Sequence, residues 1–234
     1  MIKFKEYDKV ILSVSGGKDS QAMVEVMVAE AISQEAQDKL LLAYADTGAE
    51  WKESRMQCQE MEAFYGIPLR IIEAYRPLPE HIERRGMWPS MACRYCTSDC
   101  KRAAVDKAVR EHTGNILVVT GERREESRKR ALLEETGPLS RLSTKDRIVT
   151  SFRPMLGFTE QDVWRIIGAS GLRHHPAYDY GNERVSCALC VLASENDLRI
   201  GAEHHPDLAE RYLRMEKKIG HTFRSGKRLK DTLK

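Results

Sequence analysis

The stretch Ser13-Val14-Ser15-Gly16-Gly17-Lys18-Asp19-Ser20 decides the fold, because it follows the apolar run Val10-Ile11-Leu12 directly and leads into a helical pattern. Its two glycines allow the backbone to approach an anion closely and to adopt positive φ. The N–H groups at the start of the next helix carry partial positive charge, and Lys18 adds a full one. The spacing is not that of the Walker loop. It predicts a phosphate-binding turn, with an ordinary glycine turn as the alternative.

Strand and helix patterns alternate onward from this turn. Apolar runs predict strands at 10–14, 40–44, 69–72 and 116–119, and amphipathic runs predict helices at 21–33, 54–65 and 100–112. This order is typical of the α/β class with a doubly wound, mostly parallel sheet and helices on both faces. Ligands of such sheets collect beyond the carboxyl ends of the strands. These ends carry the glycine loop, Asp46-Thr47-Gly48 and Gly121-Glu122-Arg123.

The C-terminal third has a helical character. Thr159 and Asp162 form an N-cap pattern ahead of an apolar face at 163–167, and further helices are predicted at 195–202 and 208–219. We therefore predict a nucleotide-binding domain at 1–150. A helical extension at 151–234 is expected to pack on the same domain.

Several polar segments lie outside these elements. Trp88, in the insert 76–98, is a candidate for stacking on a base. His174-His175-Pro176 predicts a solvated turn, with a lining of the substrate mouth as the alternative, and His204-His205-Pro206 predicts a helix boundary. A basic tail predicts a solvated face or a frayed end, with a nucleic-acid contact as the alternative. Its cations are Arg224, Lys227, Arg228, Lys230 and Lys234.

Composition excludes membrane and secreted classes from the prediction. The chain has a hydrophobic content of 41% and a charged content of 31%, which are typical of a soluble globular protein. No apolar run approaches membrane-spanning length, and the first residues, Met-Ile-Lys-Phe-Lys-Glu, lack the apolar core of a signal peptide. We expect a cytoplasmic protein with no membrane partner. The net charge of +3 is too small to indicate a partner.

Six cysteines in a cytoplasmic chain indicate metal or redox chemistry more than disulfides. Four of them form the Cys-x-x-Cys pairs Cys93/Cys96 and Cys187/Cys190, which together predict a four-sulfur zinc site or a [4Fe–4S] cluster. Spacing alone does not separate zinc from iron. Cys100 is an alternative upstream ligand, a carrier of a persulfide, or a buried small side chain. Cys58 lies in a helical pattern and is expected in the core.

Four segments resemble the phosphoadenosine-phosphosulfate (PAPS) reductase family, in the family's order. They are 15–20, Asp46-Thr47-Gly48, 121–127, and the segment from Arg153-Pro154-Met155 through Trp164 to His175-Pro176-Ala177-Tyr178. The first resembles the PP-loop of the adenine-nucleotide α-hydrolase-like superfamily, whose members act on ATP between the α and β phosphates. The segment 96–102 is similar to a Cys-Thr-x-x-x-Lys element of family members outside sulfate assimilation.

The resemblance implies a set of site residues. Lys18, Asp19 and Arg123 would be catalytic. ATP and Mg²⁺ would be bound by Ser13, Ser15, Gly16, Gly17, Lys18, Asp19, Ser20, Asp46, Thr47, Gly48, Gly121 and Arg128. Cys93, Cys96, Cys187 and Cys190 would bind metal, and relatives with an iron–sulfur cluster favour [4Fe–4S] over zinc.

The resemblance also distinguishes between branches of the family. Sulfate-reducing members carry a terminal Glu-Cys-Gly-x-His motif, whereas the last cysteine of this sequence is Cys190. This favours the phosphorothioation-type branch, in which ATP would adenylate an acceptor ahead of sulfur transfer. A nucleic acid or nucleotide would be the acceptor, and a protein of the cysteine desulfurase type would donate sulfur. The alternatives are a sulfonucleotide reductase with an external thiol and a non-catalytic, zinc-containing subunit. The oligomeric state is not determined, and a homodimer is one option.

Overall fold

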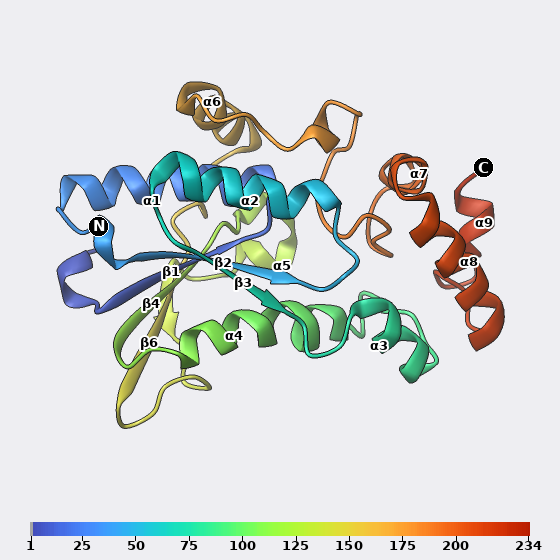
Figure 1. The fold of residues 1–234 in the computed structure, drawn as a ribbon, viewed down its shortest axis with the longest axis horizontal. Coiled ribbons are helices and arrows are strands. Elements are labelled where there is room, and N and C mark those ends of the chain that lie inside the picture. The colour runs from blue at the N-terminus through green and yellow to red at the C-terminus, as the bar shows by residue number, and fades with distance from the viewer. Residues whose placement is uncertain (1) are drawn as a thin grey trace. The chain divides into compact units, whose positions relative to one another are not determined.

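The computed structural model describes residues 2–234 and contains two compact units that interleave along the chain (Figure 1). Unit 1 consists of Met1–Tyr44, Arg55–Ile72 and Val105–His174, and unit 2 of Ala45–Ser54, Glu73–Ala104 and His175–Lys234. Residue 150, the predicted end of the nucleotide-binding domain, lies within strand β6 (Arg147–Phe152). The division into two domains at that residue stays a prediction.

Six strands form one sheet in the order β3-β2-β1-β4-β6-β5. β1 pairs in parallel with β2 and β4, β4 pairs in parallel with β6, and the short edge strand β5 is antiparallel to β6. The predicted α/β class with a mostly parallel sheet is thus confirmed. The other strands are β1 (Lys9–Val14), β2 (Leu40–Asp46), β3 (Leu69–Glu73), β4 (Gly114–Thr120) and β5 (Thr136–Pro138). The sequence prediction missed β5 and β6.

Helices cover both faces of the sheet, as predicted. Figure 1 shows α1 (Lys18–Ser33) and α2 (Lys52–Tyr65) along one face and α4 (Ala103–Arg110) along the other. The predicted helix 100–112 begins instead as a π-helical turn, η3 (Cys96–Arg102), that runs into α4. Short 3₁₀ turns η1, η2 and η4 and the helices α5 and α6 complete this part of the chain. Their bounds are Phe4–Glu6, Gln37–Lys39, Arg124–Glu126, Arg128–Ala131 and Glu160–Ser170.

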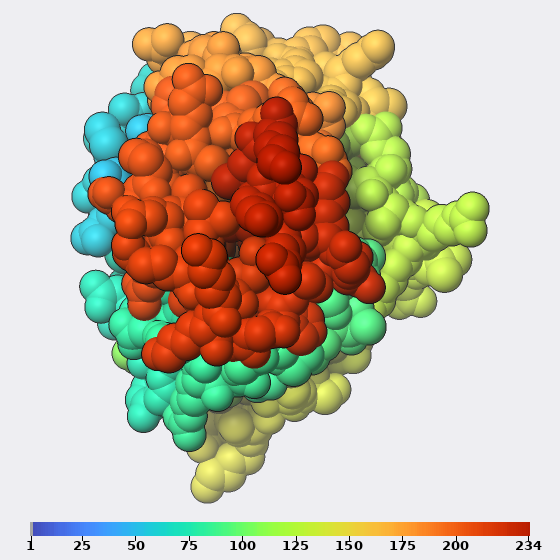
Figure 2. All heavy atoms as spheres, turned by 90° about the vertical axis from the view of Figure 1, so that its right-hand side faces the viewer, coloured from blue at the N-terminus to red at the C-terminus, as the bar shows by residue number. Residues whose placement is uncertain are grey.

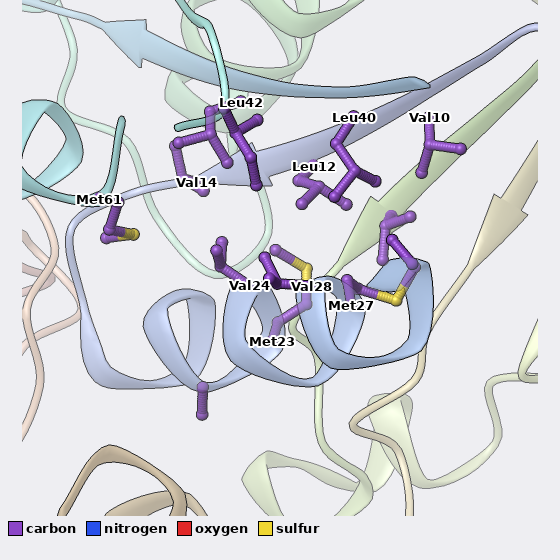
Figure 3. Close-up of a cluster of buried hydrophobic side chains, with 14 of the residues drawn as sticks. Val10, Leu12, Val14, Met23, Val24, Met27, Val28, Leu40, Leu42 and Met61 are labelled. Atoms are coloured by element: carbon purple, nitrogen blue, oxygen red, sulfur yellow. The ribbon is translucent and has the colours of Figure 1, made fainter. Parts of the chain in front are cut away.

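The core of unit 1 lies between β1, β2 and α1 (Figure 3). Parallel pairing sets Val10 beside Leu40 and Leu12 beside Leu42, so that alternate side chains of both strands point to the same face. Met23 and Met27 of α1 meet them there, and all of these side chains are buried. Each such side chain contributes about 1.5–3 kcal/mol on burial. This apolar layer fixes the start of α1 at the end of β1.

Helix α6 joins the same core through an N-terminus that the sequence predicts. Thr159 accepts a hydrogen bond from the Asp162 backbone N–H, and Asp162 accepts one from the Thr159 N–H in return. This capping box fixes the helix start. Val163 and Ile167 are then buried in the core of unit 1.

Unit 2 is a helical unit with its own aromatic core. Trp88 lies edge-on against Tyr212 and Phe223, with ring centroids 4.9 and 5.0 Å away, and its Nε1 donates to the His221 carbonyl. The expectation that Trp88 stacks on a base is therefore wrong, because the ring is buried. The helices of this unit are α3 (Leu78–Arg85), η5 (Pro176–Tyr178), α7 (Glu195–His204), α8 (Pro206–Ile219) and α9 (Leu229–Thr232). The boundary between α7 and α8 at His204-His205-Pro206 confirms the prediction for that segment.

The C-terminal tail is folded and not frayed. Figure 2 shows its residues, in red, as part of one continuous surface with the orange residues of α7 and α8. The Glu216 carboxylate accepts hydrogen bonds from the backbone N–H groups of Phe223 and Leu229, and the Arg224 guanidinium donates to the carbonyls of Val191 and Ala193. Lys227 also pairs with Glu195, whereas Arg228, Lys230 and Lys234 are exposed, so the tail keeps a solvated basic face. No helix in the described part of the chain has the length and apolar character of a membrane span.

Two histidines with buried Nε2 atoms, His112 and His205, make the stability of the fold sensitive to pH. Burial lowers the pKa of His112 and of His205 below the ordinary value of 6.5. Among the described residues, neither ring has a hydrogen-bond partner at Nε2. Lys52 and His204 add to the lowering at His205, while Glu53 opposes it. A proton would therefore place an unpaired charge in the interior of either unit.

We expect the urea midpoint to fall as the pH is lowered from 7 to 5.5. The unfolded chain binds protons near pH 6.5, before the folded histidines do, so protonation favours unfolding in this window. The carboxylates with lowered pKa values contribute only at lower pH. A His205→Gln variant should show a weaker pH dependence, whereas His221→Gln, at an exposed site, should retain that of the parent. The same change of urea midpoint with pH in the parent and in both variants would contradict this account.

Candidate active site

The glycine loop after β1 has the conformation that the sequence predicts. Gly16 has φ 77°, which a side chain would strain, and Gly17 is the N-cap of α1. Ser20 donates from Oγ to the Gly17 carbonyl at 2.8 Å and accepts from the Ser15 N–H at 3.2 Å. These two serines therefore fix the shape of the loop as well as being candidate phosphate ligands.

The end of β4 lies against the first turn of α1. A Cβ on Gly121 would be 2.6 Å from the Asp19 carbonyl oxygen, so only glycine permits this approach. Gly121 is thus next to the loop, and its predicted place in the nucleotide site stays a prediction.

The three predicted catalytic residues form one ionic group at the start of α1. Asp19 lies between two buried cations, with Lys18 Nζ 3.5 Å from Oδ2 and Arg123 Nε 2.6 Å from Oδ1. Burial opposes the charge on Arg123, but the bonds to Asp19 and Glu125 outweigh it and raise the pKa of the guanidinium. Both cations are therefore held beside the loop where an anion would bind.

Carboxylates that the sequence analysis did not single out complete this group. Glu160, the first residue of α6, has Oε1 3.4 Å from Lys18 Nζ. Glu125 pairs with Arg123 and accepts the Glu160 backbone N–H at 2.7 Å. Glu160 is distant from Lys18 in sequence, and its only signal was its place at a helix start. Arg128 is exposed at the start of α5 and is a candidate for substrate contact only as a prediction.

Cys58 lies beneath the loop in the core of unit 1, as expected from its helical pattern. Burial raises the pKa of its thiol to about 12, and a hydrogen bond from the Gly16 backbone opposes the rise. The thiol is thus protonated at neutral pH and has no reactive character.

In unit 2, the Asp46-Thr47-Gly48 turn is held by two carboxylates. Asp46 Oδ1 accepts from the Gly48 N–H at 3.0 Å. Glu50 accepts from the Thr47 N–H at 2.8 Å and from Thr47 Oγ1 at 2.7 Å. Thr47 is therefore engaged within its own turn, and its role in nucleotide binding stays a prediction.

Glu50 also contacts the second cysteine pair. Its side chain is only 7% exposed, its Oε1 accepts from Cys187 Sγ at 3.6 Å, and Lys101 Nζ lies 3.5 Å from the same oxygen. The backbone of Glu50 forms a β-bridge with Cys187, and Ala188 donates its N–H to the Ala49 carbonyl. Sequence analysis missed Glu50, because a single acidic residue after a turn has no distinctive spacing.

Five cysteines lie in the core of unit 2 or pack against it. They are Cys93, Cys96, Cys100, Cys187 and Cys190, and all are free thiols. Burial raises the pKa of Cys187 well above its ordinary range, and Glu50, Cys190 and Cys96 add to the rise while Lys101 opposes it. Burial likewise raises the pKa of Cys96, and that of Cys100 to about 11. Without a metal, the thiols of Cys96, Cys100 and Cys187 are protonated, and metal binding would release their protons.

Cysteine thiols are suitable ligands for zinc or an iron–sulfur cluster, but these side chains are not arranged around a common metal position. Residues 2–234 contain no group of three or more His, Cys, Asp or Glu side chains that could hold a metal ion. Cys93, Cys96, Cys187 and Cys190 are thus close enough to share one core without forming a coordination sphere. Lys101, whose pKa is raised by Cys187 and Glu50 despite burial, would balance the charge of thiolates.

His175 is buried and not part of a solvated turn, which corrects the expectation for 174–176. Its Nδ1 accepts from the Ala177 N–H at 3.1 Å, so the proton is on Nε2, which donates to Ser54 Oγ at 3.2 Å. The ring thus joins α2 to the segment before η5 within unit 2.

Sequence comparisons find relatives of this chain among uncharacterized proteins. The chain is 26% identical to an uncharacterized protein of Methanocaldococcus jannaschii over 94% of its own length, which is 50% of the relative. It is 25% identical to an uncharacterized 37.8 kDa protein of Escherichia phage 186, over 95% of this chain and 79% of the phage protein. The chain thus spans about half the length of the archaeal relative.

Solved structures show the same fold. PAPS reductase from Candida auris, in complex with phosphate, superimposes with a TM-score of 0.53 at 12% identity, over 77% of this chain and 82% of that one. FMN adenylyltransferase from Candida glabrata, in complex with FAD and inorganic pyrophosphate, gives 0.55 at 15% identity, over 79% and 58%. The model of the phosphoadenosine phosphosulfate reductase domain matches residues 9–193. Because that match covers most of the chain, the protein belongs to the phosphoadenosine phosphosulfate reductase domain family.

Proposed function

We propose that this protein binds ATP at the Ser15–Ser20 loop and cleaves it between the α and β phosphates to adenylate an acceptor for sulfur transfer. The observation that carries the proposal is the pair of buried cations, Lys18 and Arg123, held by Asp19 at the start of α1. Helix N-termini with such cations bind phosphate groups. Family membership supports the assignment of the anion as an adenine nucleotide.

The reaction would proceed in two displacements. An oxygen of the acceptor attacks the α phosphorus, the bond to the bridging oxygen breaks, and pyrophosphate leaves with its electron pair. Lys18 stabilises the charge on the departing group, and Arg123 keeps Asp19 oriented toward Lys18. Asp19 is the candidate contact for Mg²⁺. The terminal sulfur of a persulfide on a donor protein of the cysteine desulfurase type then displaces AMP from the acceptor. An external thiol cleaves the resulting disulfide, so that the sulfur stays on the acceptor and the donor thiol is released.

The acceptor is proposed to be a nucleic acid or a nucleotide. The proposal draws on the phosphorothioation-type resemblance and not on the basic tail, where Arg224 and Lys227 are engaged within unit 2. The thiols of unit 2 are proposed to hold a [4Fe–4S] cluster, with zinc as the alternative. Cys93, Cys96, Cys187 and Cys190 would be its ligands, and Cys100 would replace Cys93 in the alternative set. A cluster would supply a binding site for sulfur or a structural cross-link.

Product analysis tests the proposed reaction. The full chain, purified without oxygen, is incubated with ATP, Mg²⁺ and sodium sulfide, which replaces the sulfur donor, in the presence of duplex DNA or tRNA. AMP and pyrophosphate in equal amounts are expected. ADP and phosphate, or ATP binding without turnover, would contradict the proposal, and the latter would favour a non-catalytic subunit.

Family membership also favours a second candidate, reduction of a sulfonucleotide by an external thiol. The same protein is therefore incubated with PAPS or adenylyl sulfate and dithiothreitol. Release of sulfite without ATP would establish this activity in place of adenylation. Iron and zinc contents of the same sample, with its visible spectrum, separate the two metal assignments: about four irons and a broad band near 400 nm indicate a cluster, and about one zinc indicates a structural site.

A further inference from the structure

We propose that Glu160 is an internal competitor for phosphate at Lys18 and thereby sets the affinity of the loop for the pyrophosphate moiety of its nucleotide. The inference rests on the proposed function for the identity of the anion. It concerns a residue to which neither the loop motif nor the family match assigns a role.

The side chains around the loop provide no excess positive charge for an incoming anion. Lys18 and Arg123 are the buried cations, and each has a side chain only 4% exposed. Among the described residues, Asp19, Glu125 and Glu160 contact these two cations, so at least three carboxylates face them. A pyrophosphate group that enters this set must either displace a carboxylate from Lys18 or bind against net negative charge.

Glu160 is the carboxylate that can leave most easily. Asp19 is bound to Arg123 as well as to Lys18, with only 26% of its side chain exposed. Glu160, by contrast, has a side chain 53% exposed and lies 3.4 Å from Lys18 Nζ without the short bond of a tight pair. Its carboxylate can therefore rotate into water at small cost.

The backbone of Glu160 would not move with the side chain. The Thr159–Asp162 capping box fixes the helix start, and the Glu160 N–H donates to Glu125. A carboxylate at the first helical position remains favourable beside the helix dipole when it is rotated away from Lys18. The exchange therefore needs only a rotamer change: phosphate takes the place of one carboxylate at Lys18, and the helix stays in position.

The test measures binding of inorganic pyrophosphate to the full-length chain by calorimetry, with and without Mg²⁺. Glu160→Gln removes the charge and keeps the shape. It is expected to bind pyrophosphate about 3- to 10-fold more tightly than the parent in both conditions, because Lys18 no longer has to exchange partners. The gain should shrink at high salt. Glu60→Gln, at an exposed position of α2 in the same unit, is the matched control and should bind like the parent.

Unchanged affinity in Glu160→Gln, with normal binding by the parent, would overturn this inference alone. Weaker binding that appears only with Mg²⁺ would also overturn it, because it would identify Glu160 as a ligand of the cation. Absence of pyrophosphate binding by all three proteins would overturn the proposed function as well. Thermal unfolding of each variant shows whether a change in affinity reflects loss of the folded loop.

Discussion

Replacement of Lys18 by alanine is expected to reduce the rate of pyrophosphate release from ATP by about 100- to 1000-fold, the effect of removing one preorganised charge from a developing anion. The ammonium group is buried beside the loop and is oriented by Asp19 and Glu160. Water does not replace it easily at such a site, so the lost stabilisation is not recovered from solvent. The measurement is single-turnover release of pyrophosphate at saturating ATP.

Two further variants separate charge from structure. Lys18→Arg keeps the charge but places a planar fork where a compact ammonium fits, and it should retain only part of the activity. Lys5→Ala, at an exposed position of the same unit, should retain the parental rate. Equal rates in Lys18→Ala and the parent would exclude the loop as the site of catalysis.

Gly201→Ala is expected to destabilise unit 2 by about 1–3 kcal/mol, the usual range for forcing a methyl group into a packed site. Gly201 lies in α7, where an added Cβ would overlap the carbonyl oxygen of Ala188. Ala188 is the residue directly after Cys187, so α7 packs directly against the second Cys-x-x-Cys turn. The variant should lower the urea midpoint and, if metal is bound, also the metal content of the purified protein.

Gly168 offers a matched control in a second helix. It lies in α6, and nothing lies within 4 Å of the position that its Cβ would take. Gly168→Ala should stabilise the protein by about 0.5–1 kcal/mol through helix propensity. The same glycine-to-alanine substitution should thus destabilise the protein in α7 and stabilise it in α6. Stabilisation by both would show that the contact between Gly201 and Ala188 is not maintained in solution.

The sequence predicted those strands and helices whose pattern lies within a few consecutive residues. Strong apolar runs predicted β1, β2 and β4, and the Thr159–Asp162 spacing predicted the start of α6. β6 was missed because Thr150 and Ser151 interrupt its apolar run. Ser151 is buried in the sheet, where its hydroxyl donates to the Gly137 carbonyl of β5. In the sequence, a polar residue inside a strand pattern predicts a loop. The hydrogen-bond partner that allows its burial is distant along the chain and cannot be recognised from local sequence.

The site could be predicted in part for the same reason. The loop motif located Lys18 and Asp19, and the resemblance located Arg123, but Glu50 and Glu160 have meaning only through their neighbours in space. Trp88 was misassigned because a polar insert suggested exposure, whereas the ring packs with Tyr212 and Phe223. Residues whose partners are distant in sequence are the ones that the structure adds.

The interleaving of the two units determines how this protein can be divided. The chain passes from one unit to the other at 44/45, 54/55, 72/73, 104/105 and 174/175, so no single cut yields a fragment that contains one unit whole and no part of the other. Truncation libraries and split-protein reassembly are therefore poor tools for assigning activities to its parts, and point substitutions are needed. The same pattern favours an origin of unit 2 by gradual lengthening of the connections that follow β2 and β3 and of the C-terminal segment. Fusion of two genes would instead have produced two continuous units. Relatives should then differ most in length at these five junctions.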